Sequence, residues 1–150
     1  MSKLQVHVAT SEDVEWIVKE AGKRMLFEEA DRAYLYNEEH LLKVYGEVVK
    51  QGVTFVCTCQ GERVGVLASM LTPNAYNPKY TSLLELFWWV SPSYRGTRVA
   101  AMLLREFERA LKEKADEAMF SLLPASSVLV EHFEKRGWKI RELSLTKELV

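Results

Sequence analysis

The chain has 150 residues, of which 48% are hydrophobic and 27% are charged, and its formal net charge at pH 7 is −1. This length and composition are typical of a single globular domain, residues 1–150, with enough apolar side chains for a core. A net charge near zero gives no general attraction to nucleic acid or to a membrane surface, so neither is expected as a partner. Because we find no signal-peptide pattern and no run long enough to span a bilayer, the expected location is cytoplasmic.

The two cysteines, Cys57 and Cys59, lie two residues apart in a stretch of alternating apolar residues. Side chains at this spacing on a strand point to the same face and are poorly placed to bridge each other. We therefore expect a buried and reduced pair, which suits the cytosol. No cluster of further ligand residues accompanies this pair, so no metal site is predicted.

The first half of the sequence predicts a strand, two helices and a hairpin. Residues 4–9 alternate as a short strand does, and Thr10, followed by acidic residues, begins an amphipathic helix. A second amphipathic helix is expected over residues 37–51, with Gly after its end. Residues 53–59 and 64–71 alternate on either side of a glycine-containing turn, which indicates a β-hairpin.

The second half predicts strands and helices in alternation. An apolar strand, Leu83–Val90, precedes a long helix that ends near Ala115, and a short strand is expected at 119–123. A strand–helix–strand succession makes these two strands parallel, with a right-handed crossover. A short helix through Arg136 and a last strand at 138–147 follow, and the changing parity of that strand predicts a bend or bulge. The predicted order is β-α-α-β-β-β-α-β-α-β, a mixed-sheet α/β fold.

The junction after Val90 concentrates residues that suit a phosphate. Gly96 lets the backbone approach a ligand closely, and Thr97 or a neighbour begins the helix, where free N–H groups and the helix dipole attract anions. Arg95 and Arg98 add two side chains that can grip phosphate as a fork. The junction therefore indicates a site for a phosphorylated cofactor. The other interpretation is a plain strand-to-helix turn with surface arginines.

The same stretch carries a family resemblance. Residues 90–104, VSPSYRGTRVAAMLL, resemble the acetyl-CoA-binding motif of the GNAT acetyltransferases, small members of which occur in bacteria and their phages. In that family's loop, Gln/Arg-x-x-Gly-x-Gly/Ala, Arg95 fits the first position and Ala100 fits the last. Arg98 stands where the family usually has Gly, which requires that φ at this position be negative. The order of the predicted elements resembles the GNAT fold along essentially the whole chain.

The resemblance implies acetyl-CoA as co-substrate. In the family the two central parallel strands splay apart, and the pantetheine arm of the cofactor pairs with backbone in the gap. That pairing falls on the main chain of Trp88 and Val90. The cofactor-binding residues implied in this way are Trp88, Val90, Arg95, Gly96, Thr97, Arg98, Val99 and Ala100.

Acetyl transfer also requires that the acceptor amine lose a proton. A lysine-like amine with a pKa of about 10.4 is neutral in roughly one molecule in 2500 at pH 7, so a base is useful. Glu85 is the only acid inside the central strand and is the candidate base, directly or through water; otherwise it reaches solvent or pairs with an arginine. A tyrosine on the last helix often protonates the leaving thiolate in the family. Phe133 occupies that position here, which leaves Ser126, Ser127 or His132 as substitutes.

Two functions follow from these residues. The first is an N-acetyltransferase that moves an acetyl group from acetyl-CoA directly to an unidentified primary amine, on a small molecule or on a protein. The alternative is a weak or inactive protein of the same fold that serves as a structural or interaction module. Product formation separates the two. The sequence leaves the oligomeric state open, with a homodimer as one option.

Overall fold

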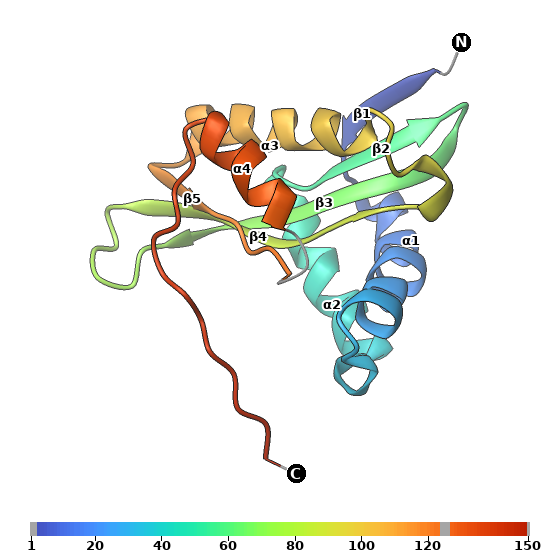
Figure 1. Ribbon diagram of the computed structural model, residues 1–150. Helices are drawn as coiled ribbons and strands as arrows, with labels where there is room; N and C mark the ends of the chain where they lie inside the picture. The colour runs from blue at the N-terminus through green and yellow to red at the C-terminus, as the bar shows by residue number, and fades with distance from the viewer. Residues whose placement is uncertain (1–2, 124–126, 150) are drawn as a thin grey trace. The chain divides into compact units, whose positions relative to one another are not determined.

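The computed structural model describes residues 3–123 and 127–149. The chain forms two compact units, Met1–Phe120 and Ser121–Val150. The first unit is built on a five-stranded sheet of order β1-β2-β3-β4-β5, in which only the β4–β5 pair is parallel (Figure 1). Its strands are β1 (Leu4–Val8), β2 (Phe55–Cys59), β3 (Glu62–Pro73), β4 (Thr81–Val90) and β5 (Glu117–Met119). The predicted mixed α/β fold is confirmed.

Helices cover both faces of this sheet. The helix that begins with α1 (Val14–Trp16) continues through two π-helical stretches, Ile17–Gly22 and Met25–Glu29. It lies with α2 (Glu38–Val48) on one face, and α3 (Val99–Lys114) lies on the other (Figure 1). No helix within the described residues is both long enough and apolar enough to cross a membrane.

The core on the α1–α2 face joins the first helix to the middle strands. Apolar side chains of the helix, among them Ile17 and Val18, pack with Val66 of β3 and with Trp89 of β4. All four are at most 2% exposed, so this face is a close-packed layer. The amphipathic pattern of the first helix therefore places its apolar stripe against the sheet, as predicted.

The β2–β3 hairpin was predicted and is present. Its turn uses Gln60 and Gly61, both with positive φ, so the hairpin is tighter and β3 starts earlier than the sequence pattern indicated. Cys57 and Cys59 of β2 are buried and unbridged, which confirms the expected reduced pair.

The strand predicted at 119–123 lies two residues earlier. β5 pairs with β4 at three positions only, from Ser82–Glu117 to Leu84–Met119. Phe120 then packs edge-to-face against Trp88, with ring centroids 5.3 Å apart, and against Phe107, at 5.5 Å. Burial of this ring between strand and helix replaces the continuation of the strand.

The last predicted strand, at 138–147, is wrong. The second unit contains α4 (Ser127–Lys135), which ends before Gly137 at φ +92, but residues 138–149 form no strand. Ile140, Leu143 and Leu145 are 64%, 83% and 97% exposed. The change in parity between Ile140 and Leu143 explains the failure, because no single face of a strand would collect all three apolar side chains.

Candidate functional site

The ladder between the two parallel strands is short. Pairing between β4 and β5 ends at Leu84 and Met119, whereas β4 continues to Val90. The N–H of Ser91 donates to the carbonyl of Val64 at 2.8 Å, on the β3 side. Because the direction of backbone groups alternates along a strand, the main-chain N–H and C=O of Val90 and Trp88 face away from β3. The splayed strands expected from the resemblance stay a prediction.

A β-bulge lies in the middle of β4. Ala68 of β3 pairs with Phe87, and Ser69 pairs with Glu85, so Leu86 is the extra residue. A bulge bends its strand and changes the direction of nearby side chains. Glu85, the candidate base, therefore lies at the irregular point of the central strand and is half-buried there.

The loop after β4 is shaped by a glycine and a hydroxyl group. Pro92–Tyr94 form one 3₁₀ turn, and Gly96 follows with φ +80, a conformation that L-residues rarely adopt. The Thr97 hydroxyl donates to the Tyr94 carbonyl at 2.5 Å and accepts from the N–H of Val99 at 3.4 Å. Thr97 thus orders the loop, and its hydroxyl is engaged within it.

The start of α3 has no side-chain cap. Arg98 is the N-cap residue, with φ −79, and makes no capping hydrogen bond. The negative φ confirms that a side chain fits where the family usually has Gly. Within the described part of the chain, the N–H groups of Gly96, Arg98, Ala100 and Ala101 donate to no protein acceptor. Free N–H groups and the positive end of the helix dipole together favour an anion here.

Close packing against β3 fixes the position of this helix start. A Cβ built on Gly65 would lie 2.7 Å from Cγ1 of Val99 and 3.2 Å from Cδ1 of Leu103. Real Cβ atoms do not approach that closely, so only glycine allows α3 to lie at this height above the sheet. Val99 is fully buried, and its contribution to the site is therefore through its backbone.

The two arginines of the loop have different surroundings. Arg95 donates through Nε to the carbonyl of Val90 at 2.9 Å, and its Nη2 forms an ion pair with Glu29. Arg98 is exposed and has no acidic partner among the described residues. A phosphate at this loop would meet Arg98 directly but would compete with Glu29 for Arg95. The Glu29 contact could not be predicted from the sequence, because Glu29 and Arg95 are far apart in the chain.

A tyrosine lies near the candidate base. Burial and the nearby carboxylate of Glu85 raise the pKa of the Tyr45 hydroxyl above its ordinary value. The Tyr45 ring also packs edge-to-face on Phe87, with centroids 5.9 Å apart. In the sequence Tyr45 belongs to the apolar stripe of the second helix, so nothing there distinguished it from a core residue.

The residues considered for protonating the thiolate belong to the second unit. Phe133 is 5% exposed and packs edge-to-face on Trp138, with centroids 5.3 Å apart. His132 is exposed. Ser126 lies outside the described residues, and nothing is described of the Ser127 side chain. No geometry therefore links these residues to the thioester.

Comparison with known proteins agrees with the fold. The Acetyltransferase (GNAT) family matches residues 15–138. The chain belongs to this family of acyl-CoA-dependent N-acetyltransferases, and the resemblance seen in the loop sequence is confirmed. A search of curated proteins finds no match.

Solved structures with the same fold cover nearly the whole chain. A GCN5-related N-acetyltransferase from Ralstonia eutropha JMP134 is 17% identical, with a TM-score of 0.76 over 97% of this chain and 98% of that chain. A possible acetyltransferase from Clostridium difficile 630 is 12% identical, with a TM-score of 0.75 over 98% and 97%. The aminoglycoside N-acetyltransferase AAC(6')-Iy, solved in complex with CoA, is 13% identical, with a TM-score of 0.71 over 99% and 96%. At these identities the likeness shows the fold.

Proposed function

We propose that this protein transfers an acetyl group from acetyl-CoA to the primary amine of an unidentified acceptor. The observation that carries the proposal is the uncapped start of α3, which follows the part of β4 that extends beyond the β4–β5 ladder. A helix start that favours an anion is what a cofactor with a diphosphate requires.

The diphosphate of acetyl-CoA binds the free N–H groups of Gly96, Arg98, Ala100 and Ala101. The Arg98 guanidinium adds a charge-assisted hydrogen bond to the same phosphates. Farther along β4, the amide groups of the pantetheine arm pair with the main chain of Trp88 and with the N–H of Val90, whose carbonyl accepts from Arg95, and β4 then holds the thioester near its bulge. Support for this arrangement comes from the direction of these backbone groups, away from β3.

The reaction is direct acyl transfer. The amine nitrogen attacks the thioester carbonyl, the C–N bond forms, the C–S bond breaks, and CoA leaves as a thiolate that takes up a proton. Having a neutral amine at pH 7 costs about 4.6 kcal/mol for a lysine-like acceptor. Glu85 accepts the ammonium proton, directly or through one water, and the half-buried carboxylate at the bulge supports this role.

The leaving group needs less help than the amine. A thiol with a pKa of about 8.5 is already a fair leaving group, and general acids typically contribute about 10²–10⁴-fold. Phe133 has no proton to give, so this protein either draws the proton from water or works slowly. The proposal assigns no general acid.

The test is amine-dependent release of CoA, followed with a thiol-reactive dye. The amine panel contains a polyamine, a lysine peptide and, because the structural neighbours include aminoglycoside N-acetyltransferases, an aminoglycoside. We expect at least one amine to accelerate CoA release, and Glu85→Gln to lower kcat by at least tenfold while CoA affinity changes little. If acetyl-CoA neither stabilises the protein nor is consumed with any amine, the alternative of a non-catalytic module replaces this proposal.

A further inference from the structure

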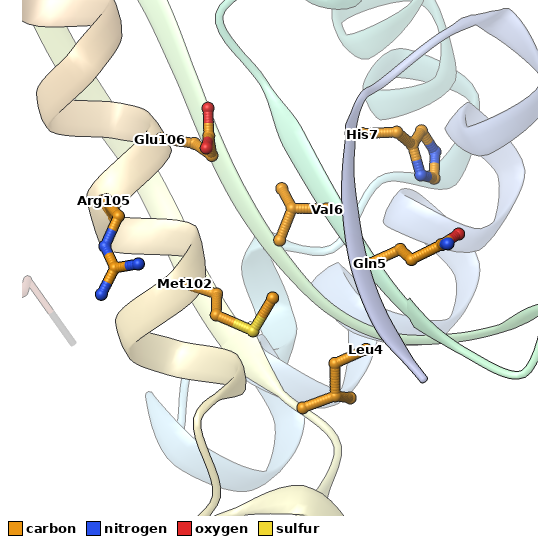
Figure 2. Close-up of a pocket in the computed structure, with 7 residues that line it drawn as sticks. All are labelled: Leu4, Gln5, Val6, His7, Met102, Arg105 and Glu106. Carbon is orange, nitrogen blue, oxygen red and sulfur yellow. The ribbon is translucent and has the colours of Figure 1, made fainter. Parts of the chain in front are cut away.

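The groove between β1 and the first half of α3 favours neither sign of charge. It has a volume of about 450 Å³ (Figure 2). Leu4 and Val6 of β1 lie toward Met102 of α3, and Arg105 and Glu106 of α3 add one positive and one negative side chain. The lining of this groove therefore indicates no class of ligand. A cluster on the other face of the sheet is more specific.

Two aromatic rings hold an ammonium group at the end of the first helix. The rings of Phe27 and Tyr36 have centroids 6.0 Å apart and are inclined at 77°. The Nζ of Lys23 lies 5.7 Å from the centroid of Phe27 and 5.6 Å from that of Tyr36. Both distances are within the range of a cation–π interaction. Phe27 and Tyr36 thus form a two-sided aromatic cage, and the cation in it is a primary ammonium of the protein itself.

Backbone turns bring the two rings of the aromatic cage together. The N–H of Arg32 donates to the carbonyl of Leu26 at 2.8 Å, and Asp31, just before Arg32, has φ +51, so the helix ends in a tight turn. A 3₁₀ turn, Ala33–Leu35, then returns Tyr36 to the helix. The cage is therefore positioned by the backbone and does not depend on the lysine.

The surroundings of the cage are acidic. The Tyr36 hydroxyl donates to Oε1 of Glu38 at 2.9 Å, and burial together with this carboxylate raises the pKa of Tyr36 to about 12. Residues 28–39 contain one arginine and five acids, which are Glu28, Glu29, Asp31, Glu38 and Glu39. The segment that carries the cage therefore has a net negative charge, which attracts a cationic ligand.

The cage lies on an element that contacts the candidate site. Glu29, at the end of the first helix, forms the ion pair with Arg95 of the cofactor loop. Burial and the carboxylate of Glu85 together raise the pKa of Tyr45 in α2, so Glu85 lies on the face of the sheet that the first helix and α2 cover. Tyr36 packs against the core of the same face. The cage and the candidate base therefore belong to one side of the sheet.

We propose that the aromatic cage binds a second primary ammonium of the acceptor, and that Lys23 occupies the cage until the acceptor displaces it. This inference rests on the proposed function: one amine of the acceptor reaches Glu85 and the thioester, while another lies between Phe27 and Tyr36. The Lys23 ammonium is the kind of group that the two rings accept. The acceptor is therefore a molecule with at least two primary amines, either a small diamine or polyamine or a peptide with two lysines.

The exchange of one ammonium for another is physically accessible. Phe27 is 47% exposed, so a ligand reaches the cage from solvent. Lys23 is also exposed, so its ammonium is solvated as soon as it leaves the rings. Because Lys23 competes for the cage, removing it should favour the acceptor further.

Steady-state kinetics with matched pairs of acceptors test the proposal. Each straight-chain diamine is compared with the alkylamine of the same length, and a peptide with two lysines is compared with a peptide that has one. We expect kcat/KM to be about tenfold higher for the member with the second ammonium. The pairs that show this difference identify the acceptor as a small molecule or a peptide.

Variants of the cage should change this difference and nothing else. Phe27→Leu keeps an apolar side chain but removes an aromatic face, so it should abolish the advantage of the second ammonium, and Phe27→Tyr should retain it. Lys23→Ala should raise kcat/KM about threefold for the acceptors with two amines only. Lys19→Ala is the matched control, because it removes the same charge one turn earlier, where Lys19 pairs with Glu15 at 3.5 Å. An equal gain in Lys19→Ala would overturn the displacement of Lys23.

A binding measurement separates this inference from the proposed function. Protein with ¹³C-labelled aromatic rings is titrated with diaminobutane, and we expect saturable shifts of the Phe27 and Tyr36 signals that are lost for Tyr36 in Phe27→Leu. Rings that do not respond overturn the cage, whatever the turnover. Rings that respond while no amine is acetylated overturn the proposed function alone. Equal kcat/KM within every pair of acceptors overturns the inference and leaves the proposed function in place.

Discussion

The chain contains two strand-to-helix junctions on opposite faces of the sheet, and their chemistry differs. After β1, the Thr10 hydroxyl accepts the N–H of Glu12 at 3.3 Å, and the Asp13 carboxylate accepts the N–H of Thr10 at 2.8 Å. After β4, the helix starts at Arg98 with no side-chain cap and no acidic residue in its first turn. At the first junction the N–H groups of Thr10, Glu12 and Asp13 are bonded within the chain, whereas at the second those of Gly96, Arg98, Ala100 and Ala101 have no acceptor among the described residues.

One of these helix starts stabilises the fold, and the other is the one that we propose binds the cofactor. The first helix start is completed by buried Asp13, which also accepts from Arg63 at 2.8 Å and so ties the helix start to β3. A helix start of that kind contributes to folding, and the carboxylates of its first turn disfavour a bound anion. The start of α3 forgoes the cap, which typically contributes about 1 kcal/mol, and retains free donors instead. Changes at the two junctions should therefore have opposite effects on cofactor binding and on stability.

The largest expected effect comes from capping the start of α3 with a carboxylate. Arg98→Asp removes the guanidinium that we propose binds phosphate and places a carboxylate at the helix start, where it can cap the free N–H groups. We expect CoA affinity to fall roughly 100-fold, about 2.8 kcal/mol, with unchanged or higher thermal stability. Calorimetric titration measures the affinity. The matched control is Arg105→Asp, the same change of charge farther along α3. An equal loss of CoA affinity in that variant would show that the effect depends only on net charge.

Removing the Asp13 carboxylate from the first helix start should instead lower the stability of the fold. Burial raises the pKa of Asp13, but the N–H of Thr10, the Arg63 guanidinium and His7 outweigh burial, so the pKa lies below its ordinary value. A carboxyl with a depressed pKa in the folded state stabilises the protein above about pH 4, and this contribution is lost as the pH falls further. Asp13→Asn should lower the free energy of unfolding by about 2 kcal/mol at pH 7 and by less at pH 3.

Urea unfolding at both pH values measures this difference, and CoA affinity should not change. Glu12→Gln, at an exposed neighbouring position, is the control and should have little effect. An equal loss for Asp13→Asn at pH 7 and pH 3 would contradict the role of the charge.

The position of α3 can be disturbed without changing any polar group. Gly65→Ala adds a methyl group 2.7 Å from Cγ1 of Val99, which pushes the helix start away from β3. We expect a loss of about 1–3 kcal/mol in stability and a weaker CoA complex. Gly46→Ala, where a Cβ meets no atom within 4 Å, is the control and should stabilise α2 by about 1 kcal/mol. If Gly65→Ala binds CoA as tightly as the parent, the helix position does not limit binding.

The smallest expected effect concerns the ion pair between Glu29 and Arg95. Glu29→Gln removes a carboxylate that competes with phosphate for the Arg95 guanidinium, so CoA should bind about threefold more tightly at low salt. Glu28→Gln is the matched control, because Glu28 pairs with Arg24 at 3.2 Å and does not contact the loop. Weaker CoA binding by Glu29→Gln would show that Glu29 instead holds the loop in its binding conformation.

Local patterns predicted most of the fold. The strands β1, β2, β3 and β4 could be predicted from alternating apolar residues, and the first helix from its cap at Thr10. These features were sufficient because each depends on neighbours in the sequence. The conformations of Gly96 and Arg98 could also be predicted from the sequence, since a positive φ and a helix start are local properties. The prediction of a last strand was wrong because its apolar residues change parity between Ile140 and Leu143.

Long-range contacts could not be predicted from the sequence. The ion pair between Arg95 and Glu29, the approach of Tyr45 to Glu85 and the contact of Gly65 with Val99 each join residues distant in the chain. The strand β5 was misplaced for the same reason, because the position of Phe120 depends on rings from β4 and α3. These contacts shape the candidate site, so its chemistry required the structure.

The central claim is that the uncapped start of α3 binds the diphosphate of CoA while the first helix start does not. A titration of ¹⁵N-labelled protein with CoA, followed by amide NMR, tests both halves at once. The account predicts large shifts for the amides of Gly96, Arg98, Ala100 and Ala101, and small ones for Glu12 and Asp13. Saturation with CoA that leaves the four loop and helix amides unmoved would contradict it.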